Sequence, residues 1–199
     1  LALEDYLTWG YVPDHRGFLK GVEKLPAGHF RLLKHDSPPA PARQWWDVSF
    51  AERRKGSTAD LSAELLHHLR EAVSSRMVAD VPLGAFLSGG VDSSSVVALM
   101  AEASRAPVQT CSIGFDVAEL DESGYARQVA ERFGTDHRTR TVDPADFSLV
   151  DRLAGMFDEP FADASALPTW RVCELARETV TVALSGDGAD EAMAGYRRQ

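Results

Sequence analysis

The sequence is short of several features, and each shortage makes a class of protein less plausible. Its 199 residues include two cysteines, Cys111 and Cys173, in no CxxC pattern, and two cysteines do not make the disulfide framework of a small secreted domain. No apolar run approaches the roughly 18–20 residues that span a bilayer. No basic segment followed by an apolar stretch opens the chain as a signal peptide would. We therefore expect a cytoplasmic protein that does not enter a membrane.

Positive charge is also scarce. Lys and Arg number 21 against 30 Asp and Glu, which gives a net charge of −9. A nucleic-acid-binding domain usually carries a clustered basic surface, so we expect no nucleic-acid partner. A polyphosphate ligand is still compatible, because backbone N–H groups and a metal ion can hold phosphates locally. The six histidines show neither HExxH nor HxH spacing, so packing or surface roles fit them better than a zinc site.

The first 57 residues differ in character from the rest. Turn-forming residues are frequent there, as in SPPAP at 37–41, which indicates loops and short elements. We interpret residues 1–57 as a segment that docks on a main domain, with Trp45, Trp46 and Phe50 packed as anchors. The main domain is expected over residues 58–199. Because the chain starts at Leu1 and stops at Gln199 without a closing element, we expect a piece of a longer protein, truncated at the C-terminus of this domain.

From residue 58 onward, helical and strand patterns alternate. Leucines at helical spacing predict a helix over 58–77, which Pro82 separates from the next element. Alternating strands and helices imply an α/β fold, with a parallel sheet covered by helices on both faces. Short apolar runs predict strands at 83–87, 108–115, 137–142 and 179–184. The intervening helices are one containing Val96–Met100, one at 122–133 capped by Asp121 and ended by Gly134, one opened by Asp143-Pro144, and one at 164–178.

The first candidate site is the turn SGGVDSS at residues 88–94, between a predicted strand and a helix. Gly89 and Gly90 have no Cβ, so backbone N–H groups can approach an anion, and the helix N-terminus favours phosphate. Asp92 would repel phosphate unless a cation lies between them, and Mg²⁺ is the usual one. No Lys-Ser or Lys-Thr follows the glycines, so this is not a Walker A loop. An ordinary turn whose serines cap a helix is the alternative.

The second candidate site is the turn SGDGADE at residues 185–191, which follows the apolar run 180–184. It interleaves two glycines with three carboxylates. An acidic turn entering a helix is a common alternative explanation. However, ligands of open parallel sheets bind at the carboxyl ends of the strands, where both turns lie. The two turns can therefore face one crevice, and their combined groups suit a metal-bound polyphosphate.

These turns resemble two known signatures. The first is similar to SGGxDSS, the pyrophosphate loop of N-type ATP pyrophosphatases, and the second resembles SGEGxDE of the glutamine-hydrolysing asparagine synthetase family. Two further blocks resemble that family: residues 6–29, which include GYVP and KLPAGH, and DEPFAD at 158–163. The four blocks occur in the family's order and cover essentially the whole chain.

The resemblance implies a fold like that of the adenine-nucleotide α-hydrolases and an ATP-dependent, amide-forming ligase. In that family, aspartate attacks the α-phosphate of ATP to give β-aspartyl-AMP and pyrophosphate. Ammonia from an N-terminal glutaminase domain then attacks the acyl-adenylate to give asparagine. The implied ligands are ATP, Mg²⁺ and a small carboxylate, and the implied partner is that glutaminase domain, which these residues do not include. A homodimer is left open, and we expect these 199 residues alone to turn over poorly.

Family roles carried over position by position fall on both turns and on two strand ends. Asp92 and Asp190 would bind Mg²⁺, and Leu87 and Ile113 would face the adenosine. Asp187 would act at the acyl-adenylate, where the family usually has Glu, so its reach is shorter by one C–C bond, about 1.5 Å. With Asp92, Asp187 and Asp190 as the expected catalytic residues, the remaining nucleotide contacts are Ser88, Gly89, Gly90, Ser93, Ser94, Ser185 and Gly186.

The shorter Asp187 leaves the acceptor open. Members of the family act on other carboxylates, including peptides, sugar acids and β-lactam precursors. A non-catalytic nucleotide-binding module is the alternative from another class, although it would not need two metal-binding carboxylates. We expect Asp158 and Glu159 to border the carboxylate pocket, with Asp163 or Ser165 available to hydrogen-bond the acceptor. Capping of the following helix by Asp163 is equally compatible with the local sequence.

Overall fold

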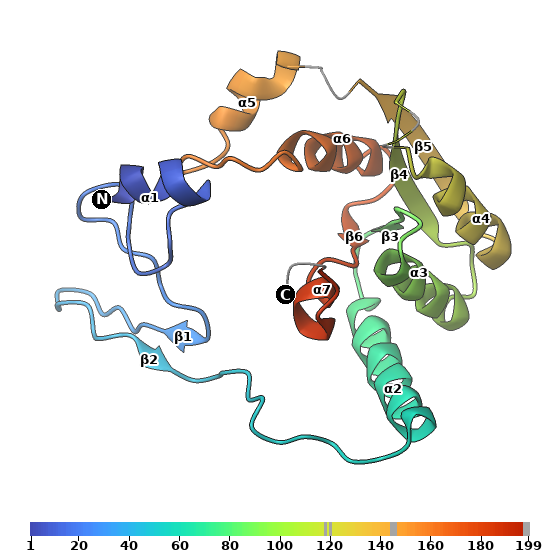
Figure 1. Ribbon diagram of the computed structural model, residues 1–199, viewed down its shortest axis with the longest axis horizontal. Coiled ribbons are helices and arrows are strands. Elements are labelled where there is room, and N and C mark those ends of the chain that lie inside the picture. The colour runs from blue at the N-terminus through green and yellow to red at the C-terminus, as the bar shows by residue number, and fades with distance from the viewer. Residues whose placement is uncertain (118, 120, 144–146, 197–199) are drawn as a thin grey trace. The chain divides into compact units, whose positions relative to one another are not determined.

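The computed structural model describes residues 1–117, 119, 121–143 and 147–196 (Figure 1). It divides into two compact units. The first unit comprises residues 1–55 and 149–164, and the second comprises residues 56–148 and 165–199. Residues 149–164 therefore pack with the N-terminal segment, although they are distant from it in sequence.

The first unit has little regular structure, as its turn-rich sequence predicts. It contains α1 (Ala2–Trp9), α5 (Val150–Ala154) and the antiparallel two-residue strands β1 (His29–Phe30) and β2 (Arg43–Gln44). The side chains of Trp45, Trp46 and Phe50 are 70%, 55% and 81% exposed, so they are not buried within the first unit, and their packing on the main domain stays a prediction. The chain forms no helix or strand from residue 45 to residue 57.

Polar contacts join the sequence blocks of the first unit. Lys24 Nζ lies 2.5 Å from Glu159 Oε1 and also donates to the carbonyl of Val12, whose side chain is 1% exposed. The N–H of Ala162 donates to Gly10 O at 3.2 Å. The blocks at 6–29 and 158–163 are thus in direct contact, which explains why a segment from the middle of the chain belongs to this unit.

The second unit contains the predicted alternation of strands and helices. Its four strands form a parallel sheet in the order β5-β4-β3-β6. Among the described residues, no helix combines the length and the apolar character needed to cross a membrane. The strands are β3 (Leu83–Phe86), β4 (Gln109–Phe115), β5 (Asp136–Val142) and β6 (Val182–Leu184), and the helices are α2 (Thr58–Arg76), α3 (Val91–Ala103), α4 (Ser123–Phe133), α6 (Ala166–Ala176) and α7 (Ala189–Met193).

Several boundaries differ from those predicted, most of them by one or two residues. Strand β6 begins three residues late, because Val180 N–H still donates to Ala176 O in the last turn of the preceding helix. The N-cap of α4 is Glu122 rather than Asp121, although the Asp121 carboxylate accepts a hydrogen bond from Ser123 N–H at 3.1 Å. The predicted opening of a helix at Pro144 lies outside the described residues, and the next described helical turn is the 3-10 helix η1 (Phe147–Leu149).

Helices cover both faces of the sheet, which confirms the predicted fold class (Figure 1). The chain moves in one direction from β3 through β4 to β5, so right-handed crossovers place α3 and α4 on the same face. The return from β5 to β6 places α6 on the other face. Two core clusters match this arrangement: Ala85 and Leu87 pack with Val97 of α3, whereas Cys111 packs with Leu175 of α6.

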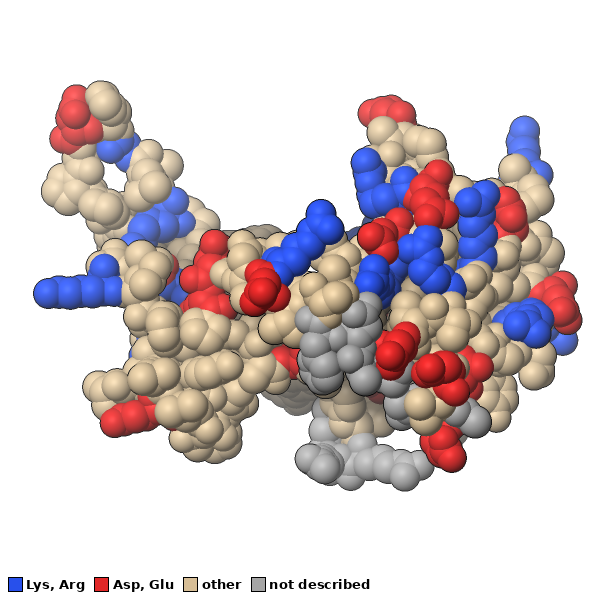
Figure 2. Space-filling view, turned by 90° about the horizontal axis from the view of Figure 1, so that it is seen from above, with Lys and Arg blue, Asp and Glu red and all other residues tan. Residues whose placement is uncertain are grey.

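Ion pairs fasten α6 to the edge strand β5. The Arg140 guanidinium contacts both Glu174 and Glu178, and Arg138 Nη1 lies 3.9 Å from Glu178. Lys and Arg side chains are interspersed with Asp and Glu on the face drawn in Figure 2. An exposed edge strand rich in charge resists pairing with the edges of other sheets, so the same residues both hold α6 and protect β5.

A polar cluster lies between β4, β5 and α4. Thr110 and Ser112 of β4 are each 3% exposed, and their hydroxyls lie 2.9 Å from Nδ1 and 3.3 Å from Nε2 of His137. Thr139 Oγ1 is 3.1 Å from the same Nε2. Burial, together with the positive charge of Arg127, lowers the pKa of His137 below its ordinary value of 6.5.

We predict that acidification destabilises the fold through His137. A histidine whose pKa is lower in the folded state than in the unfolded state binds its proton more readily when unfolded. The free energy of unfolding should therefore fall as the pH drops below the unfolded value and stop falling, for this group, below the folded pKa. Urea unfolding of wild type and His137→Gln between about pH 7.5 and 5 measures this effect. Gln keeps hydrogen-bonding groups but does not titrate, so equal pH slopes for the two proteins would contradict the prediction.

Candidate functional site

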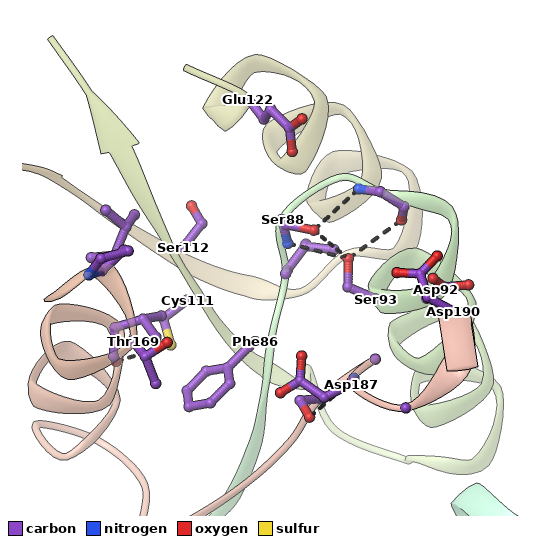
Figure 3. A pocket seen from close by; sticks show the side chains of 18 of the residues that line it. Phe86, Ser88, Asp92, Ser93, Cys111, Ser112, Glu122, Thr169, Asp187 and Asp190 are labelled. Atoms are coloured by element: carbon purple, nitrogen blue, oxygen red, sulfur yellow. Dashed lines mark hydrogen bonds between the residues drawn. The ribbon is translucent and has the colours of Figure 1, made fainter. Parts of the chain in front are cut away.

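A cavity of about 680 Å³ opens at the carboxyl ends of β3, β4 and β6 (Figure 3). The strand order reverses between β3 and β6, which is where open α/β sheets bind ligands. Both candidate turns line this one cavity. The predicted site residues that it brings together are Leu87, Ser88, Gly90, Asp92, Ser93, Ile113, Ser185, Gly186, Asp187 and Asp190.

The first turn is held by its own serines. Ser93 Oγ accepts a hydrogen bond from Ser88 N–H at 3.2 Å, lies 2.9 Å from Ser88 Oγ, and donates to Gly90 O at 3.3 Å. Ser88 Oγ accepts from Gly90 N–H at 3.3 Å. Gly90 is the N-cap of α3 and supplies no side-chain cap, so the N–H groups of the first helical turn are left for another acceptor. The turn therefore presents a preformed helix N-terminus to the cavity, which favours an anion.

Gly89 and Ser94 do not line the cavity, although both were predicted to contact the ligand. Gly89 has φ +85°, and a Cβ there would lie 2.6 Å from Ala126 N, so this glycine lets the turn pack against α4. Ser94 N–H donates to Gly90 O at 3.0 Å within the first helical turn. Its Oγ is buried and has no hydrogen-bond partner among the described residues. Both residues shape the turn, and their contact with a ligand stays a prediction.

The second turn lies directly against the start of α3. A Cβ on Gly186 would be 2.7 Å from Ser93 N and 3.0 Å from Asp92 Cβ, so only glycine allows this approach. Asp187 N–H donates to Ser185 Oγ at 3.3 Å, and Gly188, with φ +91°, leads into α7. The backbone of the second turn thus touches the residue that carries the first turn's carboxylate.

The electrostatic character of the cavity is one-sided. Among the described residues, the charged side chains that line it are all acidic: Asp92, Glu122, Asp187, Asp190 and Glu191. An anion attracted by the α3 N-terminus would be repelled by these groups unless a cation accompanied it. The cavity therefore suits a polyphosphate only in a metal-bound form.

Asp92 and Asp190 fit a divalent cation. Both side chains are half-buried, line the cavity (Figure 3), and have no ion pair or hydrogen bond in the part of the chain that the structure describes. Carboxylate oxygens are the ligands that Mg²⁺ prefers in proteins, usually with water and substrate phosphates completing its shell. The more exposed Asp187 is available for a different role.

Tyr196 brings a hydrogen-bond donor into this acidic region. Its hydroxyl donates to Glu191 Oε1 at 2.7 Å, and both residues line the cavity. This bond raises the pKa of Tyr196 to about 12, with the nearby charges of Asp190 and Asp187 acting in the same direction. The bond also lowers the pKa of Glu191. The phenol therefore stays protonated and remains a donor at neutral pH.

Several lining residues were not predicted from the sequence. Burial, with Cys173 nearby, raises the pKa of Cys111 to about 11, so this thiol packs in the cavity wall as a neutral group. Phe86 and Ser112 adjoin predicted residues, and that proximity in sequence was the available signal. The residues from α6 belong to no local motif and reach the cavity only through packing. The unpredicted lining residues are Phe86, Cys111, Ser112, Phe115, Glu122, Pro168, Thr169, Val172, Gly188, Glu191 and Tyr196.

Asp158 and Glu159 line a separate hollow of about 580 Å³ within the first unit. Phe18, Leu19 and Lys24 are among its other lining residues. The expectation that Asp158, Glu159 and Asp163 border an acceptor pocket stays a prediction, as does that for Ser165, which is the N-cap residue of α6.

We predict that Gly186→Ala separates the two turns and weakens binding of Mg²⁺-ATP, the ligand expected from the sequence. The added methyl group would meet backbone atoms of Asp92 and Ser93, which cannot move aside as a flexible side chain can. Isothermal titration with a non-hydrolysable ATP analogue should show affinity reduced about tenfold or more. The matched control is Gly124→Ala, because no heavy atom lies within 4 Å of a Cβ built there. Equal affinities for the two variants would show that the contact between the turns does not matter for binding.

Comparison with known proteins shows which family the chain resembles. A family model described as asparagine synthase matches residues 64–199. The chain is 38% identical over 201 residues to a putative glutamine-hydrolyzing asparagine synthetase 2 of Methanocaldococcus jannaschii, covering 98% of this chain and 38% of that protein. It is 31% identical over 203 residues to glutamine-hydrolyzing asparagine synthetase 1 of Bacillus subtilis, covering 98% and 30%. It is also 27% identical over 202 residues to a protein of Penicillium rubens named amidase chyE, covering 92% and 30%.

Similar solved structures include an NH3-dependent NAD synthetase from Campylobacter jejuni, with a TM-score of 0.47 and 12% identity over 67% of this chain and 60% of that one. The chain spans between about three tenths and two fifths of the length of the asparagine synthetases that it resembles, with 38% and 30% coverage of the two proteins above. The family model covers most of the chain and includes both turns of the cavity. The chain therefore belongs to the asparagine synthase family.

Proposed function

We propose that this chain supplies the active site of an ATP-dependent, amide-forming ligase, which adenylates a carboxylate for attack by ammonia. The observation that carries the proposal is the composition of the cavity. An open helix N-terminus faces carboxylates that are unneutralised within the described chain, and this combination suits a phosphate ligand and a cation bound together. Membership of the asparagine synthase family supports the same conclusion.

The residues divide into three groups by role. The first turn of α3, with Gly90 and the adjoining serines, would bind the β- and γ-phosphates through N–H and hydroxyl donors. Asp92 and Asp190 would hold Mg²⁺, which when bound offsets the negative charge of the phosphates. Leu87 and Ile113, at the ends of neighbouring strands, would contact the adenosine.

The reaction then needs positioning more than acid–base chemistry. A carboxylate oxygen of the acceptor attacks the α-phosphorus, the bond from that phosphorus to the bridging oxygen breaks, and pyrophosphate leaves with the bonding electrons. Ammonia next attacks the acyl carbon and expels AMP. Holding the acceptor in line with the α-phosphate supplies much of the rate, because orientation converts a bimolecular step into one within a complex. Asp187, exposed on the second turn, is the carboxylate we assign to accept a proton from the attacking nitrogen.

Aspartate is the acceptor that we propose first, because the relatives at 38% and 31% identity are named asparagine synthetases. Ammonia would then come from a glutaminase domain of the complete protein, as the names of those relatives suggest. Another carboxylate is the second candidate. It is favoured by the short side chain of Asp187 and by the similarity to a protein named as an amidase.

Isotope exchange between pyrophosphate and ATP, measured in the complete protein with a panel of carboxylates and Mg²⁺, tests the proposal. Clear preference for aspartate supports an asparagine synthetase. Activity with a peptide or a sugar acid, and none with aspartate, refutes that acceptor and leaves adenylation standing. Nucleotide binding without exchange for any carboxylate indicates a binding module instead.

We predict that Asp92→Asn and Asp190→Asn each lower the exchange rate by about two orders of magnitude, as loss of a charge-stabilising group in an active site commonly does. Asn keeps the shape of the side chain and removes the charge that would hold the cation. Thermal unfolding should change little, because polar substitutions outside the core usually shift stability by about 0.5 kcal/mol or less. Glu131→Gln, an exposed carboxylate change on α4 away from the cavity lining, is the control. Full exchange activity in Asp92→Asn would remove this residue from the cation site.

A further inference from the structure

The helix that carries Asp190 is too short to be stable alone. Helix α7 has five residues, whereas isolated helices shorter than about 12–15 residues are marginal in water. Its two ends are also unusual. Gly188 precedes it with φ +91°, and Ala194 follows it with φ +55°, a left-handed conformation that costs a residue with a Cβ about 1 kcal/mol. Contacts from residues outside the helix must therefore hold α7 in place.

The turn after α7 lies against the Asp190 carboxylate. Gly195 N–H donates to Asp190 O at 2.9 Å. A Cβ on Gly195 would lie 1.9 Å from Asp190 Oδ1, so the backbone of this glycine occupies the space beside that oxygen. The position of residues 194–196 consequently restricts where the Asp190 side chain can point.

The bond between Tyr196 and Glu191 closes this turn. The Tyr196 hydroxyl reaches back five residues to Glu191 Oε1 at 2.7 Å, so it ties the end of the turn to the helix that the turn follows. Within the described chain, Gly195 and Tyr196 thus contact consecutive residues, Asp190 and Glu191. Loss of the hydroxyl bond would leave the turn held by the backbone bond from Gly195 N–H to Asp190 O, and would loosen the group that packs against Oδ1.

We propose that Tyr196 is a positioning residue for the cation site: its hydrogen bond to Glu191 holds the 194–196 turn against Asp190 and orients that carboxylate toward the cavity. This inference rests on the proposed function, because it takes Asp190 as a ligand of the nucleotide-bound cation. The role is distinct from substrate contact, since Tyr196 acts through the turn and Asp190.

Cation binding, rather than activity alone, is the test. Mn²⁺ replaces Mg²⁺, and its binding to the complete protein with a non-hydrolysable ATP analogue is measured by the EPR signal of the free ion. Tyr196→Phe keeps the ring and loses the donor, so Mn²⁺ affinity should fall about tenfold, within the range expected for a coupled pair. Glu191→Ala should give the same loss. Glu191→Gln separates the bond from the charge, because its carbonyl oxygen can still accept a hydrogen bond from the phenol, so its Mn²⁺ affinity should stay clearly above that of Glu191→Ala.

The double variant Tyr196→Phe/Glu191→Ala should bind Mn²⁺ no more weakly than either single variant, because both substitutions break the same bond. A Tyr196→Phe protein that binds Mn²⁺ like wild type but exchanges slowly would overturn the proposal and indicate substrate contact. Lower melting temperature with unchanged Mn²⁺ binding would also overturn it and indicate a purely structural bond. If Tyr196→Phe does not fold, Glu191→Ala and Glu191→Gln carry the same comparison.

These measurements distinguish failure of the Tyr196 proposal from failure of the proposed adenylation function. Wild-type protein that binds Mn²⁺ with the nucleotide analogue, but shows no pyrophosphate exchange with any carboxylate, contradicts the adenylation proposal and leaves the role of Tyr196 to the variant comparison. Exchange in wild type, together with full Mn²⁺ affinity in both Tyr196→Phe and Glu191→Ala, supports the proposed function and removes Tyr196 from the cation site.

Discussion

The contact between Gly186 and the first turn of α3 is the constraint on which the rest of the site depends. It brings a turn from late in the chain to within van der Waals distance of Asp92 and Ser93. The contact exists because β6 pairs directly with β3, in a register that sets Ala85 opposite Leu184. Both strands then end at the same level, and their turns leave the sheet together. A different neighbour for β3 would leave two unrelated glycine-rich turns and no shared cavity.

Charge gives that cavity its chemical character. The positive end of the α3 dipole is local and modest, equivalent to about half a charge. The acidic side chains around it are several, and the described residues that line the cavity include no basic one to offset them. The charge of such a site disfavours free anions and suits phosphates that arrive with a cation. The same arrangement explains how a chain with a net charge of −9 can be built to hold a polyphosphate.

The two halves of the site differ in how firmly they are held. The first turn has serine hydrogen bonds within it and a long helix behind it, and Gly89 packs it against α4. The second half ends in the five-residue helix α7, whose position depends on contacts at its ends. One half is therefore preformed by local structure, whereas the other relies on residues that follow it. The turn after α7 is therefore the part of the site where a change can alter the orientation of the Asp190 side chain.

The sequence by itself determined the strand–helix alternation and the two turns, because short segments of consecutive residues specify both features. Apolar runs of a few residues specify strands, and the combination of glycines with Asp92 or Asp190 marks the two turns as candidates for binding phosphate or metal. Only the tertiary structure decided that residues 149–164 join the N-terminal segment and that Val172 lines the cavity. These features depend on strand order and on packing between residues far apart in the chain, and local periodicity carries no information about either.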